Sequence, residues 1–195
     1  AAIKGNPSLC PLMGKTVRQG AEAWGVAPVD FVLDLLLAAH GRIEAIYHAL
    51  SEDNMREILS WPFVSVGSDS TARGVAPGGD GGDHPHPRAF GTPARFLRVM
   101  AREEKRLSIE EAVRKMTSLP ARQAGFADRG ILAPGMSSDI AILDIDKVTD
   151  RAAIDNPFQT SLCVADVVVN GVIVVRDGAL TGAKPGRVLR RAAAG

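Results

Sequence analysis

The chain has 195 residues, of which 46% are hydrophobic and 23% charged, so it fits one globular domain or two small ones. Lysine and arginine number 23 and aspartate and glutamate 22, and this balance argues against a dedicated nucleic-acid binder. No apolar run approaches the ~20 residues that span a bilayer, since even 31–39 contains Asp34. Residues 1–5 also lack the pattern that begins a signal peptide. We expect a cytoplasmic protein with no nucleic-acid and no membrane partner.

The two cysteines, Cys10 and Cys163, predict neither a disulfide framework nor a zinc cluster. They show no CxxC spacing, and two thiols cannot supply the four ligands of a structural zinc site. We expect both to be partly buried thiols in a reducing compartment.

Hydrophobic spacing predicts that the first part of the chain is mostly helical. Pro28 suits the first turn of a helix, and Asp30 lies near the positive end of its dipole. The apolar residues that share one face of this helix are Val29, Val32, Leu33, Leu36 and Leu37. A second helix is predicted to begin at Ser51, whose hydroxyl can cap free amides, and to end at Trp61.

One strand and one loop interrupt the helices. The strand is predicted near 63–69, where β-branched and aromatic residues lead into Gly67 and Ser68. The stretch 74–83 is too rich in glycine for a helix or strand interior, so we expect a loop there.

Two more helices are predicted after this loop. The first covers 93–102, with Pro93 at its start. The second lies near 108–117, where Ser108 and Glu111 have the spacing of a capping box, in which each side chain bonds the other residue's backbone amide.

The pattern changes to β after Gly125. Residues 138–143 read as a strand, and residues 164–175 as a hairpin in which Asn170-Gly171 supplies the two positive-φ positions of a type I′ turn. We therefore divide the chain into a helical part, residues 1–125, and a β-rich part, residues 126–195.

Asp69 is the first candidate for chemistry. It follows a buried-looking strand and precedes a long loop, the place where α/β folds carry reactive groups. On spacing alone, an aspartate in an ordinary Asx-turn remains the alternative reading.

The stretch His84-Pro85-His86-Pro87-Arg88 is the second candidate. Imidazoles two residues apart on an extended chain project in alternate directions, which argues against a metal site made by this pair alone. His86 and Arg88 fit a role in substrate contact or loop anchoring, because arginine can bind a carboxylate with two hydrogen bonds. A solvated surface arginine is the alternative.

Several of these stretches, in the same order, resemble the D-aminoacylase branch of the amidohydrolase superfamily, whose members are N-acyl-D-amino-acid deacylases. The stretches that carry the resemblance are 65–69 (SVGSD), 86–92 (HPRAFGT), 107–117 (LSIEEAVRKMT), 129–140 (RGILAPGMSSDI), 169–172 (VNGV) and 182–187 (GAKPGR). Shorter likenesses begin at Gly14 and Ser51, so the resemblance covers nearly the whole chain.

The resemblance implies a metal-dependent (β/α)8 barrel with an attached β-sandwich. In such enzymes a zinc-bound water attacks the amide carbonyl, and an aspartate at the end of the last barrel strand accepts and later returns the proton. Asp69 matches that aspartate. Ser68, His86 and Arg88 would then lie on or near the active-site loop, and residues 126–195 would form the sandwich portion.

The family's metal ligands lie on earlier strands, and no stretch of this chain matches them. We therefore expect a C-terminal portion of a zinc-dependent N-acyl-D-amino-acid deacylase that by itself holds no metal and is inactive. The fold alone would need ~250 residues for a complete barrel. One alternative is a non-catalytic binding or assembly module that self-associates. Another is a chain completed in trans by a missing N-terminal segment.

Overall fold

The computed structural model describes residues 2–3, 6–47, 49–72, 74 and 85–191. The elements of the first half are β1 (Ala2–Ile3), the 3₁₀ helix η1 (Pro7–Leu12), α1 (Val17–Trp24), α2 (Pro28–Ala38), β2 (Ile43–Glu44) and α3 (Glu52–Ser60). Those of the second half are α4 (Arg88–Phe96), the π-helix η2 (Leu97–Glu103), α5 (Ile109–Met116), α6 (Ser118–Gln123), β3 (Ile140–Leu143), β4 (Val164–Val169), β5 (Val172–Arg176) and β6 (Ala179–Leu180).

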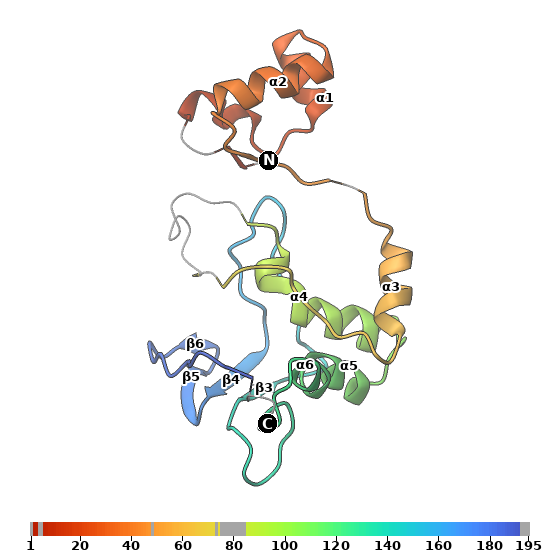
Figure 1. The fold of residues 1–195 in the computed structure, drawn as a ribbon, viewed down its shortest axis with the longest axis vertical. Coiled ribbons are helices and arrows are strands. Elements are labelled where there is room, and N and C mark those ends of the chain that lie inside the picture. Colours follow the sequence, from red (N-terminus) through yellow and green to blue (C-terminus); the bar gives the residue numbers. More distant parts are fainter. Residues whose placement is uncertain (1, 4–5, 48, 73, 75–84, 192–195) are drawn as a thin grey trace.

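The N-terminal helices α1 and α2 pack against each other at one end of the long axis (Figure 1). Thr16 caps α1 with a full capping box, in which its hydroxyl accepts from the Gln19 amide and Gln19 accepts from the Thr16 amide. Gly20 allows the two helices to approach closely, since a Cβ there would lie 2.2 Å from the Phe31 ring. A small core forms around this contact.

Helix α2 begins at Pro28 as predicted, but its burial differs from the expected pattern. The side chains that it buries are Phe31 and Leu35. The predicted apolar face is largely exposed, with Val29 70%, Leu33 55% and Leu37 74% exposed. Apolar spacing identified the helix correctly, yet it did not identify which face packs within the described residues.

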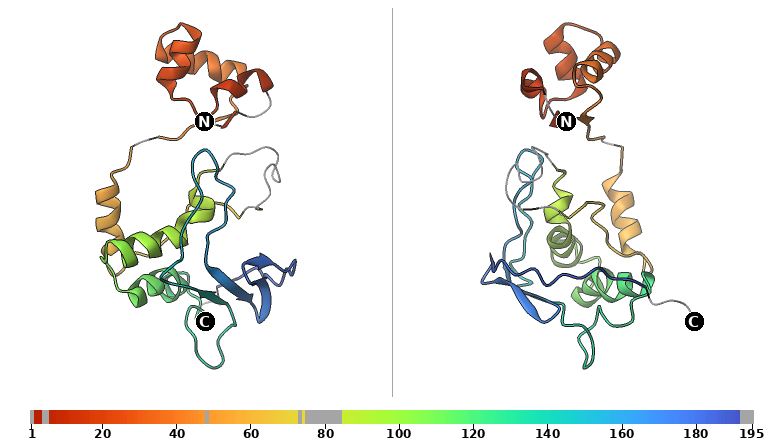
Figure 2. Two further views of the ribbon diagram at one scale, coloured as in Figure 1. Left: turned by 180° about the vertical axis from the view of Figure 1, so that it is seen from behind. Right: turned by 60° about the vertical axis from the view of Figure 1, so that its left-hand side comes forward.

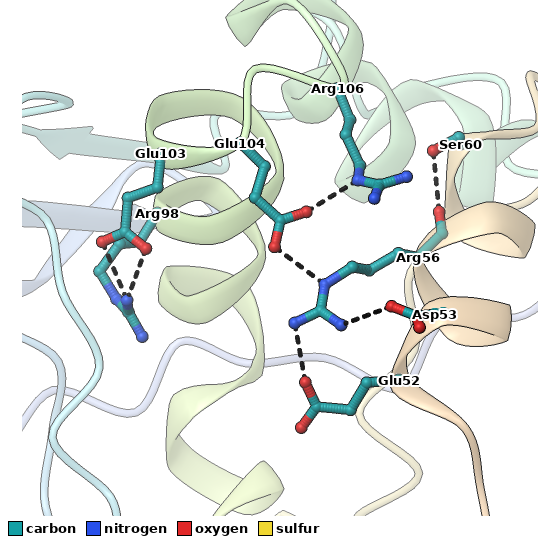
Figure 3. A network of polar contacts seen from close by, with 8 residues as sticks. All are labelled: Glu52, Asp53, Arg56, Ser60, Arg98, Glu103, Glu104 and Arg106. Carbon is teal, nitrogen blue, oxygen red and sulfur yellow. Dashed lines mark hydrogen bonds and ion pairs between the residues drawn. The ribbon is translucent and has the colours of Figure 1, made fainter.

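Helix α3 is capped by Ser51 as predicted, and Arg56 connects it to the end of η2. Arg56 bonds Glu104 (Nε to Oε1, 2.9 Å) and Glu52 of its own helix (Nη2 to Oε2, 2.7 Å), as Figure 3 shows. Arg106 bonds the other oxygen of Glu104 at 2.8 Å. These ion pairs connect α3 to the C-terminal end of η2, which continues α4.

The helix predicted over 93–102 is longer at both ends, because α4 begins at Arg88 and η2 continues it to Glu103. Pro93 lies inside α4 instead of at its start. The π-helix faces the β-rich part, where Arg102 donates to the carbonyls of Ile145 and Val148. The second core lies here, and it joins residues on both sides of Gly125.

The four-stranded sheet is antiparallel in the order β3-β4-β5-β6, beside α5 and α6 (Figure 2). The 164–175 hairpin is confirmed, with Asn170 and Gly171 at φ 47° and 78°. Helix α5 is confirmed at 109–116. Its capping box is only half formed, because Ser108 accepts from the Glu111 amide while the Glu111 carboxylate binds Arg114.

The strand predicted near 63–69 is not formed in the part of the chain that the structure describes. A strand needs a neighbour to pair with, and the described strands pair among themselves in two other sheets. Both cysteines are free and exposed, whereas we expected them partly buried. The loop residues 75–83 lie outside the described residues. Among the described helices none is long and apolar enough to cross a membrane.

Candidate active site

Asp69 lies at the end of the segment that follows α3, and its backbone is unusual. Its φ is +49°, in the left-handed region that L-residues other than asparagine and aspartate seldom adopt. Its side chain is 86% exposed, and Oδ2 lies 3.0 Å from Arg88 Nη2. Ser68, directly before it, is half-buried. The carboxylate is thus presented to solvent from a backbone position of positive φ, and the Arg88 guanidinium contacts it.

Arg88 and His86 come from the start of α4, on the other side of the glycine-rich stretch. The Arg88 amide donates to His86 Nδ1 at 3.1 Å, so Nδ1 acts as an acceptor in this structure. Burial, and secondarily the Arg88 charge, lower the pKa of His86 below its ordinary value. Both effects favour the neutral imidazole, whose proton then lies on Nε2.

The structure therefore brings three of the four predicted residues into one chain of contacts. His86 Nδ1 accepts from the Arg88 backbone, and the Arg88 side chain pairs with Asp69. Ser68 is placed by its position next to Asp69. Such a constellation offers an exposed carboxylate for proton transfer and a guanidinium able to bind an anionic substrate group.

A buried lysine supports the segment that carries Asp69, and sequence reasoning missed it. Lys115 on α5 is 0% exposed, and its Nζ donates to the carbonyls of Trp61 and Val64. The available signal was its spacing, because Lys115 falls three residues after Ala112, which is also fully buried. A lysine at a buried helical position is rare unless its amine is bonded.

A metal centre does not arise from the described residues. Among them no group of three or more histidine, cysteine, aspartate or glutamate side chains is placed to hold an ion. His84 lies outside the described residues. The described donor residues therefore do not by themselves fit a zinc site.

Comparison with known proteins shows which family the chain resembles. The profile of the Amidohydrolase family matches residues 27–175. An N-acyl-D-glutamate deacylase of Alcaligenes xylosoxydans xylosoxydans is 39% identical over 178 residues, which are 91% of this chain and 34% of that protein. The chain thus spans about a third of the length of this curated relative.

Two solved structures agree. A crystal structure of a D-aminoacylase superposes with a TM-score of 0.81 at 32% identity, over 94% of this chain and 36% of that one. The N-acyl-D-glutamate deacylase of Bordetella bronchiseptica, solved with zinc and a phosphonate inhibitor, gives a TM-score of 0.75 at 36% identity, over 98% and 37%. The resemblance stated from the sequence is confirmed, and the fold matches the D-aminoacylase structures.

Proposed function

Because this chain belongs to the amidohydrolase family, we propose that it forms the C-terminal portion of an enzyme that hydrolyses N-acyl-D-amino acids to a carboxylate and a D-amino acid. Residues 1–125 would complete the (β/α)8 barrel, and residues 126–195 the β-sandwich. The support is the similarity to deacylases of N-acyl-D-glutamate and to a D-aminoacylase, each about three times as long as the part matched here.

The Asp69–Arg88 contact of 3.0 Å is the observation that carries this proposal. It joins two of the stretches on which the resemblance depends, although the glycine-rich loop separates them in the sequence. Asp69 would take a proton from the attacking water and return it to the leaving amine, a task for an exposed carboxylate within reach of the reacting atoms. Arg88 would orient Asp69 or bind the substrate carboxylate, with His86 fixing the Arg88 backbone and Ser68 bordering the site.

The proposed use of zinc by the complete enzyme rests on the relatives alone. The Bordetella enzyme was solved with zinc, and a metal in such a site polarises the carbonyl and activates water. The described residues of this chain do not supply its ligands. We propose that the chain alone does not turn substrate over.

A comparison of two proteins tests the proposal: the 195-residue chain, and the product of the complete reading frame that encodes it. Both are assayed with zinc on N-acetyl-D-glutamate and on its L-enantiomer. We expect D-specific hydrolysis by the longer product and none by the chain alone. Asp69→Asn in the longer product should lower kcat by about 100-fold or more.

Asp177→Asn is the matched control, because Asp177 is also an exposed aspartate at positive φ, in the turn between β5 and β6. It should leave kcat unchanged. Turnover by the chain alone would contradict the assigned inactivity. Full activity of Asp69→Asn would remove Asp69 from the mechanism.

A second candidate function, assembly, is favoured by the exposed apolar face of α2. Val29, Leu33 and Leu37 lie one turn apart on this face, and monomers seldom leave such a stripe uncovered. The chain would then self-associate or dock onto a separate N-terminal segment. Sedimentation of the wild type and of Leu33→Lys/Leu37→Lys decides it: a concentration-dependent mass that the double variant abolishes supports assembly, and a monomer at all concentrations rejects self-association.

A further inference from the structure

Three side chains of α5 and α6 bind four successive backbone carbonyls in the segment that leads to Asp69. The contacts are Lys115 Nζ to Trp61 O, Arg114 Nη2 to Pro62 O (2.5 Å), Gln123 Nε2 to Phe63 O (2.8 Å) and Lys115 Nζ to Val64 O (2.9 Å). One backbone bond continues the series, from the Val66 amide to Lys115 O at 3.1 Å. Carbonyls 61–64 are thus satisfied by side chains, although no strand pairs with them in the described part of the chain.

Lys115 is the centre of this arrangement. Its side chain has no exposed surface, and its amine lies between two carbonyls. Burial lowers the pKa of Lys115, the Glu111 charge opposes that shift and the Arg114 charge adds to it. An ammonium and a neutral amine both have enough protons for two carbonyls, so the contact survives either state.

These contacts end at Val66, three residues before Asp69. Three extended residues reach about 10 Å from the last anchored amide, that of Val66. The position of Asp69 is therefore limited by the anchored Val66 amide on its N-terminal side and by Arg88 at its carboxylate.

We propose that Lys115, with Arg114 and Gln123, forms a side-chain clamp that positions Asp69, so that Lys115 is a positioning residue of the deacylase. The inference rests on the proposed role of Asp69. These side-chain donors hold carbonyls 61–64 from the helix side of the segment, and the described part of the chain pairs no strand with them.

Lys115→Met tests the clamp, because it keeps much of the buried volume and removes the donors. In the 195-residue chain, followed by amide NMR, we expect hydrogen exchange at Val66 to accelerate about tenfold or more. Exchange at Val168 in β4 should stay the same, which separates local release from general unfolding. The amide signals of Asp69 and Arg88 should shift or broaden.

Two further variants complete the test. Lys115→Gln restores an NH₂ donor, and we expect it to return part of the protection at Val66. Arg122→Met is the matched control, because Arg122 donates to the Ser118 carbonyl of its own helix and does not touch the clamp. It should leave Val66 and Asp69 unchanged. If Lys115→Met does not fold, Gln123→Leu removes a single, exposed donor instead. We then expect hydrogen exchange at Val66 to accelerate, by less than in Lys115→Met.

In the longer product, Lys115→Met should lower kcat about tenfold or more with little change in KM, as expected when a reacting group is displaced. Unchanged Asp69 and Arg88 signals, despite faster exchange at Val66, would overturn the positioning role. Full activity of Asp69→Asn would instead overturn the proposed role of Asp69, and no D-specific hydrolysis by the longer wild-type product would overturn the proposed function. In either case the NMR result would still judge the clamp. The two failures are therefore distinguishable.

Discussion

Arg88 Nη2 lies 3.0 Å from Asp69 Oδ2, and the pair bridges the two ends of the glycine-rich stretch. Their side chains are 46% and 86% exposed, and ion pairs this exposed contribute about 0–1 kcal/mol to stability. The contact therefore matters less for folding than for where the carboxylate points. That distinction can be measured.

Arg88→Met should separate orientation from stability. We expect the free energy of unfolding to fall by less than about 1 kcal/mol in urea titrations. In the longer product, kcat/KM for the proposed deacylase reaction should fall about tenfold or more, because the carboxylate loses its fixed direction. Arg151→Met is the control, since Arg151 is also exposed and binds a carbonyl, that of Thr160. A large loss of stability in Arg88→Met would show that the pair is structural.

His86 should titrate below its ordinary pKa of about 6.5, because burial and the Arg88 charge disfavour the imidazolium. A histidine with a lowered folded-state pKa contributes stability that is present above about pH 6.5 and is lost as the pH falls through the folded-state pKa. Protonated Nδ1 can no longer accept from the Arg88 amide. We therefore expect the Arg88 amide signal to follow the imidazole titration in NMR.

Two variants check this prediction. His86→Gln should abolish the titration of the Arg88 amide. Arg88→Met should raise the pKa of His86 part of the way back, because the charge is removed and the burial remains. A His86 pKa above 6.5 in the wild type would contradict the prediction.

The elements with local signals could be predicted from the sequence. A proline in the first turn marks α2, a serine cap marks α3 and α5, and Asn170-Gly171 marks the hairpin. Each of these signals acts within a few residues. They do not depend on what the rest of the chain packs against.

The features that depend on distant partners could not be predicted. The segment near 63–69 has strand-forming residues, but its carbonyls bind side chains of α5 and α6 instead of a neighbouring strand. Lys115 reads as a surface residue by type, and its burial follows only from the two carbonyls that surround it. For the same reason the proximity of Asp69 and Arg88 came from the family resemblance and not from spacing.

Asp150→Asn should destabilise the junction between η2 and the β-rich part. The Asp150 side chain is only 9% exposed and binds Arg98 Nε at 2.9 Å, with Arg95 Nη1 at 3.6 Å. We expect a loss of about 1–3 kcal/mol in the free energy of unfolding, because a buried charged contact is removed. The exposed Asp155, changed to asparagine, is the control.

The pH dependence of Asp150 has a definite sign. Burial alone would raise the pKa of Asp150, but the hydrogen bond from Arg98 and the two arginine charges outweigh it and lower the pKa. A carboxyl with a lowered folded-state pKa adds stability above its unfolded pKa of about 4, which is lost as the pH falls through the folded-state value. The stability difference between wild type and Asp150→Asn should therefore shrink below about pH 4. A constant difference down to pH 2 would contradict this cause.

Gly130→Ala should lower the free energy of unfolding more than Gly135→Ala does. Gly130 has φ +90°, and an added Cβ would lie 2.9 Å from Ser118 Cα and 3.0 Å from Thr117 O, at the start of α6. Gly135 has a similar φ of +84° but open space around it. Gly135→Ala should cost about 1–2 kcal/mol for the left-handed backbone alone, and Gly130→Ala about 1–3 kcal/mol more for the clash.

Urea unfolding of the two variants measures that difference, provided that the slope with denaturant stays the same. Equal losses would show that α6 moves away freely. Since α6 ends with Gln123, which holds the Phe63 carbonyl, a shift of α6 in Gly130→Ala should also accelerate hydrogen exchange at Val66. Gly135→Ala should leave that amide as protected as in the wild type.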